Sequence, residues 1–129
     1  MTRRLVSSGS PLEPRIGFSR AVRLGDSVWV AGTAPIWPSG EVDPNVGVQA
    51  ERCLEIIGSA LREADAALSD VVRTRVYLVD RADGAAVAAV HGRVFGSVRP
   101  VTTFVVVAGF LDPRWRVEVE ADAVVVSSR

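Results

Sequence analysis

Short stretches in which polar and apolar residues alternate recur along the chain, and this period of two predicts β-strands with one buried face. The pattern predicts a first strand over residues 3–8, a hairpin over residues 19–32 and a strand over residues 71–79. Gly25 and Asp26 supply the hairpin turn. The third strand is expected to carry two arginines on one face and apolar or hydroxyl side chains on the other: Arg73 and Arg75 against Val72, Thr74, Val76 and Leu78.

Apolar residues spaced three and four positions apart predict two helices. The first is expected over residues 48–67 and the second over residues 83–96, with Asp83 as its candidate N-cap. Two stretches rich in proline and glycine, residues 9–17 and 33–47, are expected to be loops.

Two valine-rich stretches, residues 99–107 and 115–126, predict the last two strands, which we expect to lie side by side as the central strand pair. On the last strand, Glu118 and Glu120 share one face. The order β-β-β-α-β-α-β-β predicts an α+β fold over residues 1–129, with two helices covering one face of a mixed sheet. The other face is expected to support self-association, because it carries apolar as well as charged side chains.

Composition and charge argue against several classes of function. The chain has 129 residues, of which 48% are apolar, enough for one domain with its own core. Fifteen basic and fifteen acidic residues give a net charge of zero, which argues against a nucleic-acid partner, since phosphate binding needs a basic face. No apolar run approaches the roughly 20 residues of a membrane span, and the start lacks the apolar core of a secretory signal. We therefore expect a cytoplasmic protein without a membrane partner.

The scarcity of metal ligands and nucleophiles narrows the chemistry further. The single histidine and single cysteine lie far apart in the sequence, whereas a zinc site normally needs several such ligands, so we expect no metal. His91 falls in the middle of a predicted helix and is expected to be a packed or surface histidine. Cys53 falls on an apolar helix stripe and is expected to be a buried, inert thiol. The chain has no lysine and no glycine loop of the right spacing, which excludes a phosphate-binding loop.

The remaining candidate site combines Glu120 with Thr102, Thr103, Gly32 and Ala31. A carboxylate on a half-buried strand can hold a water molecule and act as a general base. The backbone beside Gly32, where no side chain blocks approach, can bind an oxyanion or a carbonyl oxygen. The alternative is that Glu120 only pairs with one of the two arginines on a neighbouring strand.

Three segments of the chain carry a family signature. They are the end of the hairpin over residues 28–35, the helix and strand over residues 49–61 and 70–78, and a C-terminal pair over residues 99–103 and 117–121. In this order and spacing they resemble the RidA/YjgF (Rid) family, once labelled endoribonuclease L-PSP. The resemblance covers nearly the whole chain.

The resemblance implies a chorismate-mutase-like α+β fold and a homotrimer with small-molecule clefts between subunits. Active members of the family hydrolyse reactive enamine and imine intermediates, such as 2-iminopropanoate, to 2-oxo acids and ammonia, without a cofactor or metal. The resemblance also implies a site arginine that binds the substrate carboxylate, and a glutamate on the last strand that positions the attacking water.

The resemblance transfers only in part to this chain. Glu120 falls on the position of the family's glutamate and Gly32 on the glycine whose backbone faces the ligand. Thr102 stands where the family has its arginine, Phe18 where it has a tyrosine and Ala31 where it has a serine. A threonine cannot form the bidentate, charge-assisted pair that an arginine forms with a carboxylate.

Four hypotheses follow. The first is an arginine-lacking member that binds a small metabolite and either no longer hydrolyses imines or acts on a substrate without that carboxylate; Thr102 and Thr103 then donate hydrogen bonds, while Phe18 and Trp37 form an apolar wall. The second is an imine deaminase whose arginine comes from another position. The candidates for that arginine are Arg20, Arg73 and Arg75. The third is a noncatalytic binding or chaperone-like protein. The fourth, a ribonuclease, is weakened by the net charge of zero and the absence of lysine.

Overall fold

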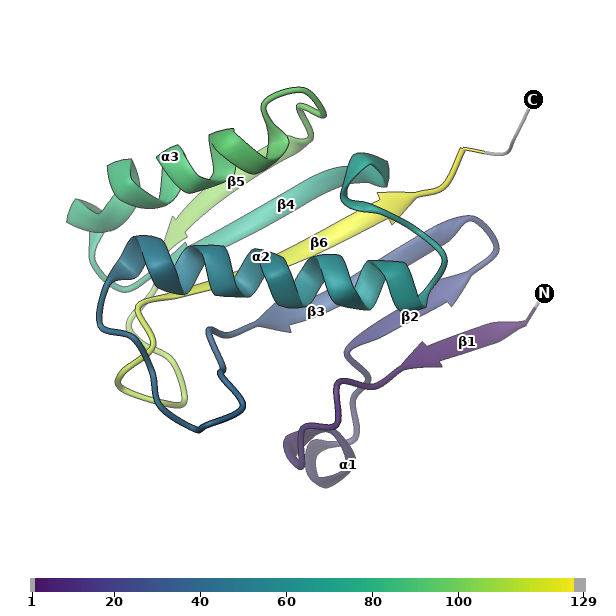
Figure 1. Cartoon of the computed structure of the whole chain (residues 1–129), viewed down its shortest axis with the longest axis horizontal. Helices are drawn as coiled ribbons and strands as arrows, with labels where there is room; N and C mark the ends of the chain where they lie inside the picture. Colours follow the sequence, from purple (N-terminus) through teal and green to yellow (C-terminus); the bar gives the residue numbers. More distant parts are fainter. Residues whose placement is uncertain (1, 127–129) are drawn as a thin grey trace.

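A six-stranded mixed sheet carries the two long helices on one of its faces (Figure 1). The computed structural model describes residues 2–126, so residue 1 and residues 127–129 of the expected domain lie outside the description. The strand order is β1-β2-β3-β6-β4-β5, with β4 and β5 parallel and all other neighbours antiparallel. The strands are β1 (Arg3–Val6), β2 (Ala21–Leu24), β3 (Ser27–Thr33), β4 (Val71–Leu78), β5 (Val101–Val106) and β6 (Val117–Val124). The helices are α1 (Leu12–Ile16), α2 (Val46–Glu63) and α3 (Gly84–Phe95), with short 3-10 turns at Leu68–Asp70 and Arg81–Asp83.

The predicted α+β fold, with two helices over one face of a mixed sheet, is confirmed. Helix α2 begins slightly before the predicted residue 48, because Asn45 caps it and accepts a hydrogen bond from the backbone N–H of Val48. The helix ends at Glu63, before the predicted end, and Asp65 then takes a positive φ of 57° that turns the chain.

Two local expectations need correction. Residues 9–17 are not entirely a loop, because they contain the short helix α1, which ends at Gly17 with a φ of 89°. Asp83 precedes α3 but makes no capping hydrogen bond. Its carboxylate instead accepts from Arg116 Nη2 at 2.7 Å, an ion pair that ties the start of α3 to the segment before β6.

The prediction that the last two strands are neighbours is wrong, because β4 lies between β5 and β6. The unit β4–α3–β5 is a crossover connection, and such a connection places its two strands parallel and side by side. Strand β5 therefore takes the outer side of β4 and becomes an edge. Strand β6 pairs antiparallel with the other side of β4 and fills the gap to β3.

The prediction that Val72 shares a face with Thr74, Val76 and Leu78 is also wrong. The side chain of Val72 is 46% exposed, whereas Thr74, Val76 and Leu78 are buried as predicted. The pairing of β4 with β6 shifts register between Val71 and Arg73. An irregularity of this kind reverses the alternation of faces on one side of it, which a strict period of two cannot anticipate.

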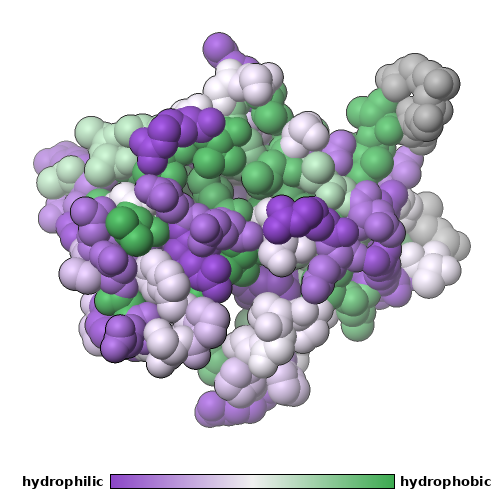
Figure 2. All heavy atoms as spheres, in the orientation of Figure 1, coloured by the Kyte–Doolittle hydropathy of each residue, from purple (hydrophilic) through white to green (hydrophobic). Residues whose placement is uncertain are grey.

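The core lies between the sheet and α2. Helix α2 buries its apolar stripe, including the predicted inert thiol Cys53, against the inner faces of β3 and β6. The fully buried side chains at this contact include Ile57, Leu61, Val28, Val76, Val117 and Val119. In the same view, Figure 2 shows hydrophilic side chains across the outward side of α2 and hydrophobic ones gathered near α3.

Gln49, a buried polar residue of α2, forms hydrogen bonds to two loops at one end of the sheet. Its Nε2 donates to the carbonyl oxygens of Asp43 (2.8 Å) and Arg114 (3.0 Å). Its Oε1 accepts from the backbone N–H of Arg116 at 2.8 Å. One fully buried amide therefore holds the loop before α2 against the segment before β6, and these two segments form part of the cavity described next.

Candidate functional site

A cavity of about 470 Å³ lies at the end of β3, between the α1 segment, the loop that follows β3 and one side of α2. Its volume is in the range of small-molecule sites. The wall is largely apolar and aromatic, and it includes Phe18, Ile36, Trp37, Leu111 and Trp115. The charged side chains that line it are Arg20, Arg52 and Glu118.

Glu118 provides the carboxylate of this cavity. It lies on β6, on the sheet face opposite the helices, and its side chain is partly buried. Within residues 2–126, neither of its oxygens has a hydrogen bond or ion-pair partner. Burial raises the pKa of Glu118, the charge of Arg20 opposes that effect, and nearby Glu120 adds to it. An unpaired carboxyl group with a raised pKa is a stronger base than an ordinary carboxylate.

Gly32 lies beside Glu118 because of a β-bulge. In the pairing of β3 with β6, Val30 faces Ala121 and Thr33 faces Val119, so Ala31 and Gly32 together oppose one residue. A Cβ built at Gly32 would stand 3.7 Å from Glu118 Oε1, with no other described atom within 4 Å. The absence of a side chain therefore leaves space next to the carboxylate.

Arg20 is the buried cation of the site. Its Nη1 donates to Gly32 O at 3.2 Å and to Thr33 Oγ1 at 3.0 Å, and its Cζ lies 5.5 Å from the centre of the Phe18 ring. Burial lowers the pKa of Arg20, while Glu13 and Glu118 oppose that effect. An arginine has so high an ordinary pKa that it keeps its charge here.

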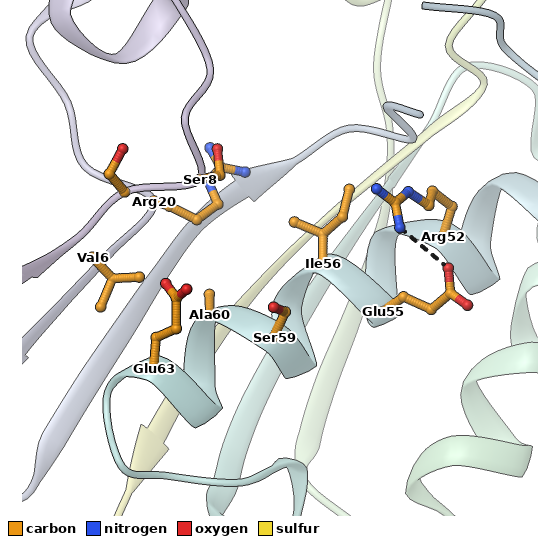
Figure 3. A pocket seen from close by; sticks show the side chains of 10 residues that line it. Val6, Ser8, Arg20, Arg52, Glu55, Ile56, Ser59, Ala60 and Glu63 are labelled. Atoms are coloured by element: carbon orange, nitrogen blue, oxygen red, sulfur yellow. Dashed lines mark hydrogen bonds and ion pairs between the residues drawn. The ribbon is translucent and has the colours of Figure 1, made fainter. Parts of the chain in front are cut away.

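A second, smaller pocket of about 220 Å³ adjoins the cavity between the end of β1 and α2 (Figure 3). It is lined by polar groups that include Ser59 and Glu63 of α2. The Arg52–Glu55 ion pair, at 3.5 Å, crosses one side of it (Figure 3). Arg20 lines both this pocket and the larger cavity.

The structure brings together only some of the residues predicted from the sequence. Phe18, Gly32 and Trp37 line the same cavity. Ala31 belongs to the bulge but does not line the cavity: its backbone N–H donates to Arg20 O, and its carbonyl oxygen accepts from Thr33 Oγ1.

Glu120 lies outside the cavity, in a cluster of polar groups on the same sheet face. Its Oε1 accepts from Tyr77 Oη at 2.5 Å and lies 3.4 Å from Arg75 Nη1. The hydrogen bond to Glu120 raises the pKa of Tyr77. Thr103 pairs with Arg75 in register on β5. The arrangement matches the alternative in which Glu120 pairs with an arginine of a neighbouring strand.

Thr102 points to the opposite face of the sheet from Glu120. Its Oγ1 lies 2.8 Å from Thr74 Oγ1, which lies 2.8 Å from His91 Nε2 on α3. His91 is partly buried, which lowers its pKa, and its ring packs 4.7 Å from that of Phe95. Thr102 and Glu120, which were expected to share one polar site, therefore lie on different faces of the sheet. Thr103 lies on the Glu120 face, because adjacent residues of a strand alternate in direction.

Cys53 is a buried thiol of α2. Burial raises the pKa of the Cys53 thiol far above its ordinary value, which makes a thiolate inaccessible. Across residues 2–126, no group of three or more His, Cys, Asp or Glu side chains is placed to hold a metal ion. No helix in that part of the chain is long and apolar enough to cross a membrane.

Sequence reasoning did not assign Glu118, and strand register alone does not favour it. The pairing of β3 with β6 places Glu120 opposite Ala31 and Gly32. Glu118 is recognised only from its side chain, whose Oε1 lies 3.7 Å from a Cβ built at Gly32. Arg20 was one of three candidate cations, and its burial follows from the position of α1 and β1, which the local pattern does not encode.

The comparison with known proteins agrees with this fold. The sequence model of the Endoribonuclease L-PSP family matches residues 9–125. The chain belongs to the Endoribonuclease L-PSP family. An uncharacterised protein of Streptomyces coelicolor is 44% identical to this L-PSP family chain over 123 residues, which are 93% of this chain and 90% of the relative.

Two solved structures extend the comparison of this L-PSP family member. The first is a crystal structure of a Mycobacterium tuberculosis protein of the YjgF/YER057c/UK114 family, 44% identical, with a TM-score of 0.89 and coverage of 96% of this chain and 100% of that chain. The second is the crystal structure of E. coli TdcF with bound serine, 26% identical, with a TM-score of 0.80 and coverage of 95% and 94%. The predicted resemblance to the RidA/YjgF family is confirmed.

Proposed function

We propose that this chain binds a small metabolite in the cavity beside Gly32 and hydrolyses an imine or enamine group of that metabolite to a carbonyl compound and ammonia. The observation that carries the proposal is the unpaired, partly buried carboxylate of Glu118, next to open space at Gly32. Phe18 and Trp37 form the apolar wall that excludes bulk water.

The chemistry needs one water molecule and one group that exchanges protons. Ionised Glu118 accepts a proton from water as the water oxygen bonds to the C=N carbon, and it passes this proton to the imine nitrogen, which gives a neutral carbinolamine. Glu118 then accepts the proton of the carbinolamine hydroxyl as the C=O bond forms, and it gives this proton to the nitrogen, which leaves as ammonia when the C–N bond breaks. An enamine enters the same sequence after protonation at carbon. A raised pKa makes the Glu118 carboxylate a stronger base towards the water molecule.

Two further facts support a small-molecule ligand. A net charge of zero and an aromatic cavity wall favour a small metabolite over RNA. The E. coli relative TdcF was crystallised with bound serine, a molecule that fits a cavity of this size.

The test compares Glu118→Gln with Glu120→Gln, because the two residues are chemically identical and lie on the same face of β6. The imine 2-iminopropanoate is generated with an amino-acid oxidase, and the imine that remains is trapped with semicarbazide. We expect the wild-type chain to reduce trapping, Glu118→Gln to lose about 100-fold in kcat/KM, and Glu120→Gln to stay within about threefold. Loss of activity in Glu120→Gln alone would assign the water-positioning role to Glu120, as the sequence motif suggests.

A noncatalytic ligand-binding protein is the second candidate. It is favoured by Thr102, which stands at the position of the family's carboxylate-binding arginine and faces α3 rather than the cavity. In that case the wild-type chain leaves imine trapping unchanged at high protein concentration. A small molecule that occupies the cavity is then expected to bind the Glu118→Gln variant as tightly as it binds the wild-type chain.

We further propose a homotrimer. All six residues of the edge strand β5 are exposed, and Trp29 is exposed on β3. An uncovered apolar edge strand presents unpaired backbone groups to which another chain can pair. The expected solution mass is three chains of 13.8 kDa each, measured by light scattering after gel filtration. A lysine pair at Val101 and Val105 is expected to shift that mass to one chain.

A further inference from the structure

A third cavity, of about 320 Å³, lies at the edge of the sheet where the parallel strands β4 and β5 end. We call it the β4–β5 cavity. It is formed by the connection that leaves β4 towards α3 and by residues 107–116, which connect β5 to β6 (Figure 1). Trp115 lines both this cavity and the cavity beside Gly32, but all other lining residues differ. The two cavities are therefore separate candidate sites.

An aromatic wall forms one part of the β4–β5 cavity. The side chains of Phe110 and Trp115 are half-buried and both line it, together with the apolar residues Val79 and Pro113. Aromatic rings bind flat apolar groups by stacking, and their faces attract cations. The volume is sufficient for a molecule with one ring and a short polar arm.

Asp80 supplies an accessible carboxylate to the same cavity. The residue is exposed and precedes the 3-10 turn at Arg81–Asp83. Its Oδ1 accepts the backbone N–H of Ala82 at 2.9 Å and so caps this turn. Within residues 2–126, its Oδ2 has no hydrogen-bond or ion-pair partner. This oxygen is therefore available for a charge-assisted hydrogen bond from a ligand cation.

The other two charged residues of the lining are paired with each other. Arg116 donates from Nη2 to Asp83 Oδ1 at 2.7 Å and from Nη1 to Pro44 O at 2.8 Å. Asp83 is only 7% exposed, and its Oδ2 is enclosed, so Asp83 acts on the cavity through its charge rather than by contact. Two carboxylates and one guanidinium leave one net negative charge, which favours a monocation over an anion.

We propose that the β4–β5 cavity binds small organic ammonium ions, with the ammonium group at Asp80 Oδ2 and a flat apolar group against Phe110 and Trp115. This site takes a ligand of a different kind from an imine substrate and lies outside the cavity that contains Glu118. The proposal therefore holds whether or not the chain hydrolyses imines.

The first experiment compares three probes with the same ring and different charge: benzylammonium, benzyl alcohol and benzoate. NMR titrations of the wild-type chain at low salt are expected to show benzylammonium binding at least about fivefold more tightly than the other two. The amide resonance of Gly109, which lines the β4–β5 cavity, should shift, whereas that of Gly32, which lines the other cavity, should not. Added salt should weaken the binding of benzylammonium, because Asp80 is exposed to solvent.

The second experiment removes one feature of the site at a time. Asp80→Asn keeps the cap, because asparagine caps a helical turn as well as aspartate does, and it should bind benzylammonium about fivefold more weakly than wild type. Phe110→Leu keeps an apolar wall without the ring face, and a loss of about threefold is expected. Glu41→Gln, which removes one charge from the exposed loop before α2, is the matched control and should bind like wild type.

The proposal is overturned if benzylammonium does not bind, if the three probes bind equally, or if folded Asp80→Asn keeps the preference for benzylammonium. A response of Gly32 in place of Gly109, or a loss of binding in Glu118→Gln, would place the probe in the cavity beside Gly32 and would also overturn it. These measurements need no turnover, so a chain that is inactive in the imine assay would overturn the proposed function alone.

Discussion

Glu118 on β6 and Gly32 on β3 meet across a β-bulge, where a Cβ added at Gly32 would stand 3.7 Å from Glu118 Oε1. This is ordinary van der Waals contact, so a methyl group fits without displacing the backbone. It would nevertheless occupy the space in which a water molecule or ligand atom reaches the carboxylate. A substitution at Gly32 should therefore affect access to the Glu118 carboxylate while it leaves the stability of the fold nearly unchanged.

Gly32→Ala is expected to change the free energy of unfolding by less than about 1 kcal/mol, because Gly32 has no positive φ to lose. Ligand affinity or kcat/KM should fall about tenfold or more. Urea unfolding and the imine assay measure the two quantities. The matched control is Gly92→Ala on α3, where an added Cβ meets no described atom within 4 Å. A large loss of stability with unchanged activity would contradict this account of the bulge.

Glu118→Gln is expected to stabilise the chain at neutral pH. Burial raises the folded-state pKa of Glu118 above its ordinary value of 4.5, so the folded chain holds this proton more tightly than the unfolded chain. The group therefore lowers stability as pH rises from about 4.5 through the folded pKa. We expect a higher Tm at pH 7, on the order of 2 °C because the side chain is only partly buried, and no difference near pH 4. If wild type and variant have equal Tm values at both pH 4 and pH 7, then neighbouring groups offset the cost of burying the Glu118 charge.

Gln49→Leu is expected to destabilise the fold by about 2–4 kcal/mol. The substitution leaves the carbonyl oxygens of Asp43 and Arg114 and the N–H of Arg116 without the amide that now satisfies them, and unpaired buried groups are costly. Urea denaturation gives the value. Glu51→Gln on the exposed side of α2 loses only a surface ion pair with Arg93, and it should cost less than about 0.5 kcal/mol.

His91→Gln is expected to flatten the pH dependence of stability below pH 6.5. Burial lowers the folded-state pKa of His91 from 6.5, so the unfolded chain binds this proton more tightly. The wild type therefore loses stability as pH falls below 6.5 towards the folded pKa. The unfolding free energies of wild type and variant are measured from pH 5 to 7.5. The difference between them should be largest at pH 7.5 and smallest at pH 5. Parallel curves would contradict this effect of burial.

Local sequence patterns predicted the elements well where one physical rule dominates. The apolar stripe of α2 determines which side is buried, so the burial of Cys53 follows from spacing alone. The hairpin of β2 and β3 follows from alternation and from Gly25, whose positive φ of 62° forms the turn. The signature segments also identified the family, because they preserve order and spacing along the chain.

The long-range pairing of strands was decided only by the tertiary structure. Alternation predicts which residues of one strand share a face, but not which strand lies next to it. The insertion of β4 between β5 and β6 separates Thr102 from Glu120, and the bulge at Ala31 and Gly32 places Glu118 beside the glycine. The burial of Arg20 likewise requires α1, β1 and α2 to close around it. The sequence by itself therefore determined the elements and the residue types available for chemistry, whereas the packing of distant segments decided which of them share a cavity, because a pKa and an unpaired donor depend on neighbours far away in the chain.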